Sequence, residues 1–481
     1  MRYKVQAYLM GTLLFYLGIV MLFPLLWAIA DFRNLLSFVI PSAISIIAGF
    51  LLRYKNIPPE NITIKESFAF VALAWPVAAL LGSLPYFISG TFLNYTDAFF
   101  ESMSGFTTTG ATVIENIEVL PRSILIWRSL TQWLGGMGII VLFVAMLPRL
   151  GIRSFNLLKA EVPGPGPERI VPRLAETAKR LWIAYFVLSV LQFFLLLASG
   201  LSLFDAINHT FTTMPSGGFS TNNSSIGGLN NLRAEMVILV FMVISGGNFS
   251  LYYALWQKQW RQVFRDTELR FYLCVLLIAS ILITLNIYQT CYETLIEAAR
   301  NGFFQVISIT TTTGYATTDY GKWPSLARII LFFLMFIGAS GGSTSGAMKQ
   351  IRIIILIKFA IREIQKVLHP SAVIPLRLRG KVIPEETVQN VIGFNILYII
   401  IFLFSSIAIG SLGLDFITSL SVAASCLGNV GPALGHLGPA HTYAGLPAIA
   451  KLFLSFIMLL GRLEIYTILV LLLPETRANR F

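Results

Sequence analysis

The chain has 481 residues, of which 56% are hydrophobic and only 12% are charged. Soluble domains carry roughly 25% charged residues, so this composition predicts an integral membrane protein. The net charge of +12 does not indicate nucleic-acid binding, because the basic residues lie between apolar segments. There they act as topology signals and contact anionic membrane lipid. The three cysteines favour neither a disulfide framework nor a metal cluster.

The first predicted elements are two membrane spans at residues 5–30 and 34–52. Each is close to or above the roughly 20 residues that a crossing helix needs. The first apolar run follows a basic start as in a signal peptide, but it is too long for one, so we expect a retained span. Arg53 and Lys55 then mark a cytoplasmic turn.

After this hairpin, a short segment rich in threonine, serine and glycine occurs four times, and we name its copies loops 1 to 4. They lie at residues 106–112, 213–221, 309–317 and 428–433, with Gly110, Gly218, Gly314 and Gly431 as equivalent glycines. The copies are separated by roughly one hundred residues, which is too long for a solenoid repeat. The four copies therefore predict four larger structural units.

Each loop follows a short amphipathic segment that opens with an acid: Asp97, Asp205, Glu297 and Asp415. The spacing from acid to glycine leaves room for two to three helical turns before the loop. An acid is favourable in the first turn of such a helix, and the negative helix end then points toward the loop. Four such ends and four loops rich in carbonyl groups would form a site for a dehydrated cation.

A single cluster of this composition would be an ordinary loop. Four clusters between long apolar segments are different, because non-helical backbone at membrane depth occurs only where it lines a cavity or is buried in protein. We therefore predict pore loops.

The predicted fold is an all-α integral membrane protein with four span–pore helix–span units around one central pore, preceded by the two-helix hairpin. Its units are the hairpin at 1–57, pore unit 1 at 58–160, pore unit 2 at 161–262, pore unit 3 at 263–380 and pore unit 4 at 381–481. The spans are expected at 66–89 and 123–147, 178–200 and 233–256, 270–289 and 325–367 (interrupted), and 387–410 and 446–473. These ten spans place both termini on one side.

Basic residues select that side as the cytoplasm. They cluster in three connections, as Arg149, Arg153, Lys159, Arg169, Arg173, Lys179 and Arg180; as Lys258, Arg261, Arg265 and Arg270; and as Lys358, Arg362, Lys366, Arg377, Arg379 and Lys381. The opposite connections hold acids, among them Glu101 and Glu115. The loops are therefore expected to open outward. Residues 163–167 alternate proline and glycine, which predicts a stiff loop and no soluble domain.

The second span of unit 3 is interrupted by a run of seven small residues at 340–346, followed by Lys349. Gly338, Gly342 and Gly346 are spaced by four, which would also suit close helix packing. A run of seven exceeds what packing needs, so we favour an unwound segment under the loops that moves as a gate. Its members are Gly341, Gly342, Ser343, Thr344, Ser345 and Gly346, with Lys349 beyond them.

Arg462 is an intramembrane charge in the last predicted span. Glu464 is two residues away, so it does not share a helix face with Arg462. Charges at this depth face the protein interior or a water-filled path. We expect Arg462 beside the cavity below the loops, and Glu464 with a basic partner on another helix.

No enzyme signature is present. The four histidines lack metal-ligand spacing, and there is neither a nucleotide-binding P-loop nor a nucleophile elbow. The chain is predicted not to be an enzyme and to carry no organic cofactor.

At this point the motifs are recognisable. Residues 97–102 running into 106–113, together with 132–139, 217–221 and 461–465, resemble the Trk/Ktr/HKT superfamily of potassium transporters over nearly the whole chain. The N-terminal hairpin is similar to the Trk branch. Two segments depart from the family pattern: Pro215 in loop 2, which removes an N–H and stiffens the chain, and a gate segment with fewer glycines before Lys349.

The resemblance implies a homodimer with one pore per protomer, in the bacterial cytoplasmic (inner) membrane. It also implies a cytoplasmic ring of TrkA-like regulatory subunits that bind NAD or ATP. It assigns the gate to residues 341–346 and a pore-facing arginine to Arg462. The predicted cation-binding residues are Thr108, Thr109, Gly110, Gly217, Gly218, Thr312, Thr313, Gly314, Asn429, Val430 and Gly431.

The predicted function is gated potassium uptake. A short filter without the full motif of dedicated potassium channels predicts modest selectivity, with Rb⁺ passing and Na⁺ passing weakly. The alternative within transport is a K⁺/H⁺ or K⁺/Na⁺ symporter, against which no buried carboxylate stands out as a proton carrier. A membrane scaffold or an enzyme with a degenerate pore is the alternative from another class, and the presence of all four loops is against it.

Overall fold

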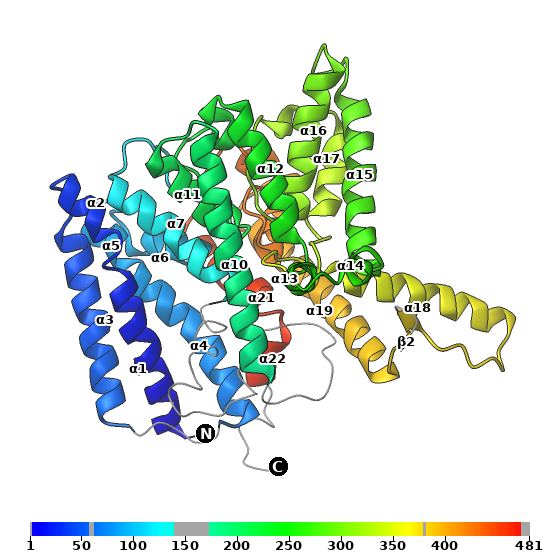
Figure 1. The fold of residues 1–481 in the computed structure, drawn as a ribbon, viewed down its shortest axis with the longest axis horizontal. Helices are drawn as coiled ribbons and strands as arrows, with labels where there is room; N and C mark the ends of the chain where they lie inside the picture. The colour runs from blue at the N-terminus through cyan, green and yellow to red at the C-terminus, as the bar shows by residue number, and fades with distance from the viewer. Residues whose placement is uncertain (1, 57–61, 139–172, 379–380, 473–481) are drawn as a thin grey trace.

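The computed structural model describes the whole chain except residues 1, 57–61, 139–172, 379–380 and 473–481. Its described part is almost entirely helical, and the two short strands β1 (Arg377–Leu378) and β2 (Lys381–Val382) pair in an antiparallel hairpin. The predicted all-α fold is confirmed. The start of α1 and the end of α22 lie on the same side of the molecule (Figure 1).

The N-terminal hairpin consists of α1 (Tyr3–Val20), α2 (Leu25–Ala30) and α3 (Leu36–Tyr54). The predicted span at 5–30 corresponds to one candidate span, Tyr3–Ala30, in which a turn before Pro24 separates α1 from α2. Proline cannot donate a backbone hydrogen bond. Helices α1 and α3 pack closely because Gly49 faces the α1 backbone, where an added Cβ would lie 2.9 Å from the Phe15 Cα. Such small residues allow close helix packing in a membrane.

Four units follow, and each contains a short helix that ends at one of the four loops (Figure 1). Unit 1 has α4 (Ile64–Gly82), α5 (Leu84–Ile88), the short helix α6 (Tyr95–Phe106) and α7 (Arg122–Gly136). Unit 2 has α10 (Arg173–Ala198), the short helix α11 (Leu203–Thr213), η2 (Ser225–Leu229), α12 (Leu232–Gly246), α13 (Phe249–Trp256) and α14 (Trp260–Phe264).

Unit 3 has α15 (Thr267–Ile287), the short helix α16 (Leu295–Thr310), η3 (Tyr320–Lys322), α17 (Ser325–Leu334) and α18 (Gln350–Leu368). Unit 4 has α19 (Glu385–Gly410), the short helix α20 (Phe416–Gly428), η4 (Gly435–Leu437), α21 (Ala448–Arg462) and α22 (Tyr466–Leu472). The short helices agree closely with the predicted pore helices.

Within the described residues, the second helix ends or bends before its predicted end in every unit, whereas an interruption was predicted only in unit 3. Helix α7 ends at Gly136, α12 meets α13 at a bend of 98°, α17 ends at Leu334, and α21 ends at Arg462. The predicted spans at 233–256 and 446–473 are therefore broken helices, α12 with α13 and α21 with α22. The predicted span at 123–147 ends as a helix at Gly136, and its part beyond residue 138 lies outside the described residues, as do the proline–glycine segment at 163–167 and the basic residues from Arg149 to Arg169.

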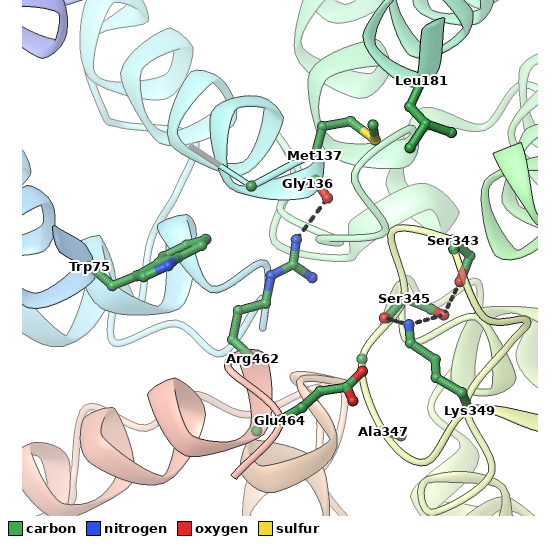
Figure 2. Close-up of a pocket in the computed structure, with 14 residues that line it drawn as sticks. Trp75, Gly136, Met137, Leu181, Ser343, Ser345, Ala347, Lys349, Arg462 and Glu464 are labelled. Atoms are coloured by element: carbon green, nitrogen blue, oxygen red, sulfur yellow. Dashed lines mark hydrogen bonds between the residues drawn. The ribbon is translucent and has the colours of Figure 1, made fainter. Parts of the chain in front are cut away.

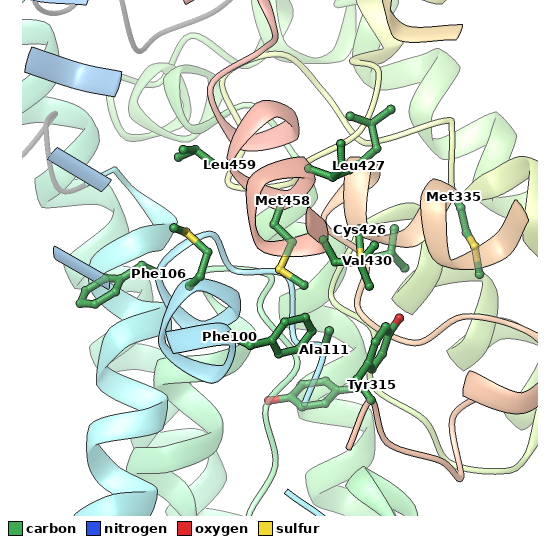
Figure 3. Packing of buried hydrophobic residues seen from close by; sticks show 14 of the residues in the cluster. Phe100, Phe106, Ala111, Tyr315, Met335, Cys426, Leu427, Val430, Met458 and Leu459 are labelled. Carbon is green, nitrogen blue, oxygen red and sulfur yellow. The ribbon is translucent and has the colours of Figure 1, made fainter. Parts of the chain in front are cut away.

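Six of the described helices or helix pairs are long and apolar enough to cross a membrane, and the bent pair α12–α13 would be a seventh. The other three predicted spans are not among them, because α17 and α21 end at Leu334 and Arg462 and the predicted span at 123–147 is described only as far as residue 138. The short helices pack in the protein interior, where Phe100, Phe106 and Cys426 meet Met458 of α21 in one hydrophobic core (Figure 3).

Candidate cation pathway

The four loops share one backbone conformation. In each, the equivalent glycine has a positive φ, and so does the residue two positions before it. The pairs are Thr108 (54°) and Gly110 (82°), Ser216 (58°) and Gly218 (77°), Thr312 (57°) and Gly314 (78°), and Asn429 (53°) and Gly431 (99°). Ser216 was missed in the sequence analysis, although its position two residues before Gly218 is the signal that identifies it.

The loops form a closed ring. A Cβ added at the glycine of one loop would lie 2.5 Å or less from a carbonyl oxygen of a neighbouring loop. The glycine–carbonyl pairs are Gly110 with Gly217, Gly218 with Thr313, Gly314 with Val430, and Gly431 with Thr109. Each carbonyl belongs to the residue immediately before an equivalent glycine, so one structural position recurs around the ring. Only glycine permits this approach and this φ.

Side chains hold the ring together between and within loops. The Asn429 amide donates to the Thr109 hydroxyl across 2.9 Å and connects loop 4 to loop 1. The Thr311 and Thr313 hydroxyls are 2.8 Å apart within loop 3. Because these hydroxyl groups bind one another, the backbone carbonyls are the groups of the ring best suited to coordinate a cation.

A buried ion pair connects loops 1 and 2. The Glu101 carboxylate accepts from Arg128 Nε at 2.6 Å and from the Val113 amide at 2.9 Å. Arg128 also donates to the Ser220 carbonyl at 3.0 Å. The sequence analysis interpreted Glu101 as an acid of an outer connection, but it is fully buried. The signal that could have revealed the pair was Arg128, a charge in an otherwise weakly polar predicted span.

Further carboxylates are buried in the described part of the chain, although the sequence analysis singled out none as a proton carrier. Besides Glu101, these are Glu66, Glu235, Asp266 and Glu268. Glu66 pairs with Arg2, Glu235 pairs with Arg300, and Glu268 accepts from backbone amides. Each of these buried carboxylates therefore has hydrogen-bonding partners that compensate for its lost hydration.

As predicted, each short helix begins near an acid and ends at a loop. Asp97, Asp205 and Glu297 lie in the first turns of α6, α11 and α16, and Asp415 caps α20 by accepting from the Thr418 amide. The opposite ends of these helices lead directly into the loops. Four helix C-termini, which carry partial negative charge, thus meet at the ring of carbonyls.

The interruption in unit 3, which we call the unit 3 break, covers residues 335–349. It is longer than the predicted 340–346, because residues 335–339 are also non-helical. Its two limbs pair through the Gly338 amide and the Met348 carbonyl at 3.0 Å, and the Met348 amide and the Phe336 carbonyl at 3.1 Å. This pairing leaves residues 340–346 as a projecting tip.

The tip contacts three of the loops. The Thr344 hydroxyl donates to the Met214 carbonyl at 3.0 Å and lies 2.9 Å from the Ser216 hydroxyl in loop 2. The Gly346 amide donates to the Thr312 hydroxyl of loop 3 at 2.7 Å. Gly346 also packs against Gly428 of loop 4. The tip therefore lies directly against the ring.

Arg462 joins the tip to unit 1. Its guanidinium donates to the Thr344 carbonyl at 2.8 Å and to the Gly136 carbonyl at 2.7 Å. Arg462 borders a cavity of about 100 Å³ that is also lined by Lys349, Ser345 and Glu464, as Figure 2 shows. This volume accommodates several water molecules.

Glu464 pairs with Arg352, just after the unit 3 break, so its partner is a basic residue of another helix. Lys349 donates to the Ser345 carbonyl within the break. In the first half of the tip, the Gly341 amide donates to Glu268, the Gly342 carbonyl accepts from the Phe249 amide at 3.2 Å, and the Ser343 hydroxyl donates to the Ser340 carbonyl at 2.6 Å. The predicted gate residues thus lie in the unit 3 break, with Arg462 in contact with it.

The fold and this site define a multi-pass membrane protein in which four pore-loop units of one chain enclose a ring of backbone carbonyls. A family model described as TrkH, cation transport protein, matches residues 35–480. The chain belongs to the TrkH family of cation transport proteins.

Individual relatives agree with this family. The chain is 39% identical over 472 residues to the Trk system potassium uptake protein TrkH of Halomonas elongata, covering 97% of each chain. It is 38% identical over 436 residues to the protein of that name in Escherichia coli K12, covering 90% of each. The crystal structure of the potassium transporter TrkH from Vibrio parahaemolyticus superposes with a TM-score of 0.89 at 35% identity, covering 99% of this chain and all of that one.

Proposed function

We propose that this protein takes up potassium across the bacterial cytoplasmic membrane through the ring formed by loops 1 to 4. The observation that carries the proposal is the closed ring in which every equivalent glycine faces a carbonyl of a neighbouring loop. Its relatives at nearly full coverage are named as potassium uptake proteins. Carbonyl oxygens replace the hydration shell of a potassium ion in a filter of this kind.

The carbonyls of Thr109, Gly217, Thr313 and Val430 are the proposed ligands, with Thr108, Ser216, Thr312 and Asn429 below them. This filter is short, so its selectivity for K⁺ over Na⁺ is modest, and Rb⁺ passes. The Gln132 side-chain amide donates to the Gly217 carbonyl at 2.6 Å. The Gly217 carbonyl would therefore bind this amide as well as the ion, which distinguishes loop 2 from the other loops.

In the proposal, the unit 3 break is the gate. Its tip lies against loops 2, 3 and 4, and Arg462 holds the tip through the Thr344 carbonyl. A permeating ion must pass this face of the ring, so the described arrangement is a closed pathway. Opening requires the tip to leave the hydroxyl groups of Ser216 and Thr312.

The proposed assembly follows from the family resemblance and from the charge pattern. Basic residues after α13 and around α18, such as Arg265 and Lys366, support the proposal that these connections and both termini face the cytoplasm. A homodimer would bind a cytoplasmic TrkA-like ring there, and NAD or ATP on that ring would control the gate.

The deciding experiment measures radioactive rubidium uptake into liposomes that contain the purified protein and a KCl-loaded interior, without a Na⁺ or pH gradient. Uptake that K⁺ inhibits better than Na⁺ is the expected result. Uptake only under an imposed proton or sodium gradient would instead establish a symporter. If no gradient produces uptake even after the tip is deleted, the proposed function is wrong.

A further inference from the structure

Glu268 is a buried carboxylate that the proposed pathway does not use. It lies in the first turn of α15, the first helix of unit 3, with a residue exposure of 4%. Helix capping does not account for it, because Asp266 is the N-cap and its carboxylate accepts from the Leu269 amide at 2.9 Å. An ionised group at such depth needs specific hydrogen bonds to compensate for its lost hydration.

Two hydrogen bonds connect the Glu268 carboxylate to the tip of the unit 3 break and to the helix that follows the break. One oxygen, Oε1, accepts from the Gly341 amide at 2.6 Å and from the Ile351 amide at 3.2 Å. Gly341 belongs to the tip, whereas Ile351 is in the first turn of α18, where backbone amides have no partner within the helix. A single oxygen therefore connects the tip to the start of α18.

The alternative is that Glu268 only caps α18. The bond to Ile351 would suffice for that role, but the bond to Gly341 belongs to the tip. The tip has further anchors besides this bond. Thr344 and Gly346 bond to the loops, and the Thr344 carbonyl accepts from Arg462. The Ser340 amide and the Gly342 carbonyl bond to the backbone at the bend between α12 and α13. Any movement that withdraws the tip from the ring changes the position of Gly341 relative to α15, and so it strains or breaks the shorter of the two bonds.

We propose that Glu268 is a positioning residue that holds the unit 3 break in its closed conformation. This inference rests on the proposed gate function. Hydrogen bonds to an ionised acceptor are roughly twice as strong as neutral ones, so the carboxylate charge itself stabilises the closed tip. Loss of that charge shifts the equilibrium toward the open tip without altering the ring.

The test compares Glu268→Gln with Glu386→Gln in the rubidium assay. Glu386 is an exposed acid of α19, so its substitution removes the same charge at the surface. We expect roughly two- to tenfold greater uptake for Glu268→Gln, the factor that weakening one such hydrogen bond produces. The ratio of K⁺ to Na⁺ competition should stay unchanged, as should uptake by Glu386→Gln.

A second measurement follows the tip itself and does not depend on flux. Ser340→Cys places a thiol at a buried side chain whose hydroxyl has no partner, so the substitution removes no hydrogen bond. In a background without Cys274, Cys291 and Cys426, labelling of this thiol should be several-fold faster when Glu268→Gln is added.

The outcomes separate the two ideas. If tip deletion raises uptake but Glu268→Gln changes neither uptake nor labelling, Glu268 is only a helix cap and the inference is wrong. If tip deletion itself gives no uptake, the proposed function fails first. Reduced uptake by Glu268→Gln together with unchanged labelling would also overturn the inference.

Discussion

At the scale of single residues, the same backbone demand is met by different side chains. The position two before each equivalent glycine is threonine in loops 1 and 3, serine in loop 2 and asparagine in loop 4, and all four have a positive φ. Only the glycine itself is invariant within the chain, because it alone faces a neighbouring carbonyl. The equivalent position must be glycine because the neighbouring carbonyl leaves no room for a side chain.

The first prediction concerns Gly314→Ser. The new side chain would collide with the Val430 carbonyl of loop 4, so rubidium uptake or its selectivity should fall at least tenfold. Gly413→Ser is the matched control, because Gly413 also has a positive φ (94°) but nothing lies within 4 Å of an added Cβ. Uptake with unchanged selectivity in Gly314→Ser would refute the filter assignment.

The second prediction uses two arginines of α7. Arg128→Gln leaves the Glu101 carboxylate buried and unpaired, which should lower the free energy of unfolding by about 3–5 kcal/mol. The Arg122 side chain is exposed and lies 4.0 Å from the Asp31 carboxylate, so Arg122→Gln should change the free energy of unfolding by less than about 1 kcal/mol. Thermal unfolding of the detergent-solubilised protein would measure both. Equal effects would mean that the buried pair does not hold loops 1 and 2.

At the scale of elements, the repeated feature is the interrupted second helix. In units 1 and 4, the glycine at the interruption packs on the same point of the short helix, Gly135 against the Phe106 carbonyl and Gly461 against the Leu427 carbonyl. A straight helix would continue through the space that the loops and the tip occupy. The four interruptions are therefore a consequence of bringing four loops to one axis.

The third prediction is that deletion of residues 341–346 raises rubidium uptake severalfold, because the contacts of the tip with Ser216 and Thr312 disappear. Arg462→Gln should raise it less, since the other anchors of the tip remain. The liposome assay measures both variants beside the intact protein. Unchanged uptake after deletion would instead favour a packing role for the small residues.

At the scale of the whole molecule, the N-terminal hairpin lies outside the fourfold arrangement. Helix α1 packs along α3 through glycines, and the salt bridge between Arg2 and Glu66 connects its start to unit 1 at 2.8 Å. None of its residues lines the cavity beside Arg462. We therefore expect the hairpin to contribute stability and not selectivity.

The fourth prediction tests that separation. Gly49→Val would force α1 away from α3, and overpacking of this kind costs about 1–3 kcal/mol. The thermal midpoint should fall, while rubidium uptake per folded protein stays constant. Gly445→Val is the control, because an added Cβ there meets nothing within 4 Å. A changed K⁺ to Na⁺ preference in Gly49→Val would show that the hairpin shapes the pathway.

The sequence by itself determined the membrane class, the four units and the short helices with their loops. Those features depend on local properties: apolar length, an acid at a helix start, and a Thr/Gly segment after it. The loop at 106–112 could be predicted because its conformation depends on its own Thr/Gly sequence and not on distant residues.

Only the tertiary structure decided the interruptions of α7, α12 and α21, the pairing of Glu101 with Arg128, and the closing of the ring. The run Gly246-Gly247-Asn248 is a local signal for a helix break, but it does not set the 98° angle between α12 and α13. The partners of Glu101, Arg462 and Glu268 come from distant parts of the chain. Their positions follow from packing four unlike units around one axis, which no local pattern encodes.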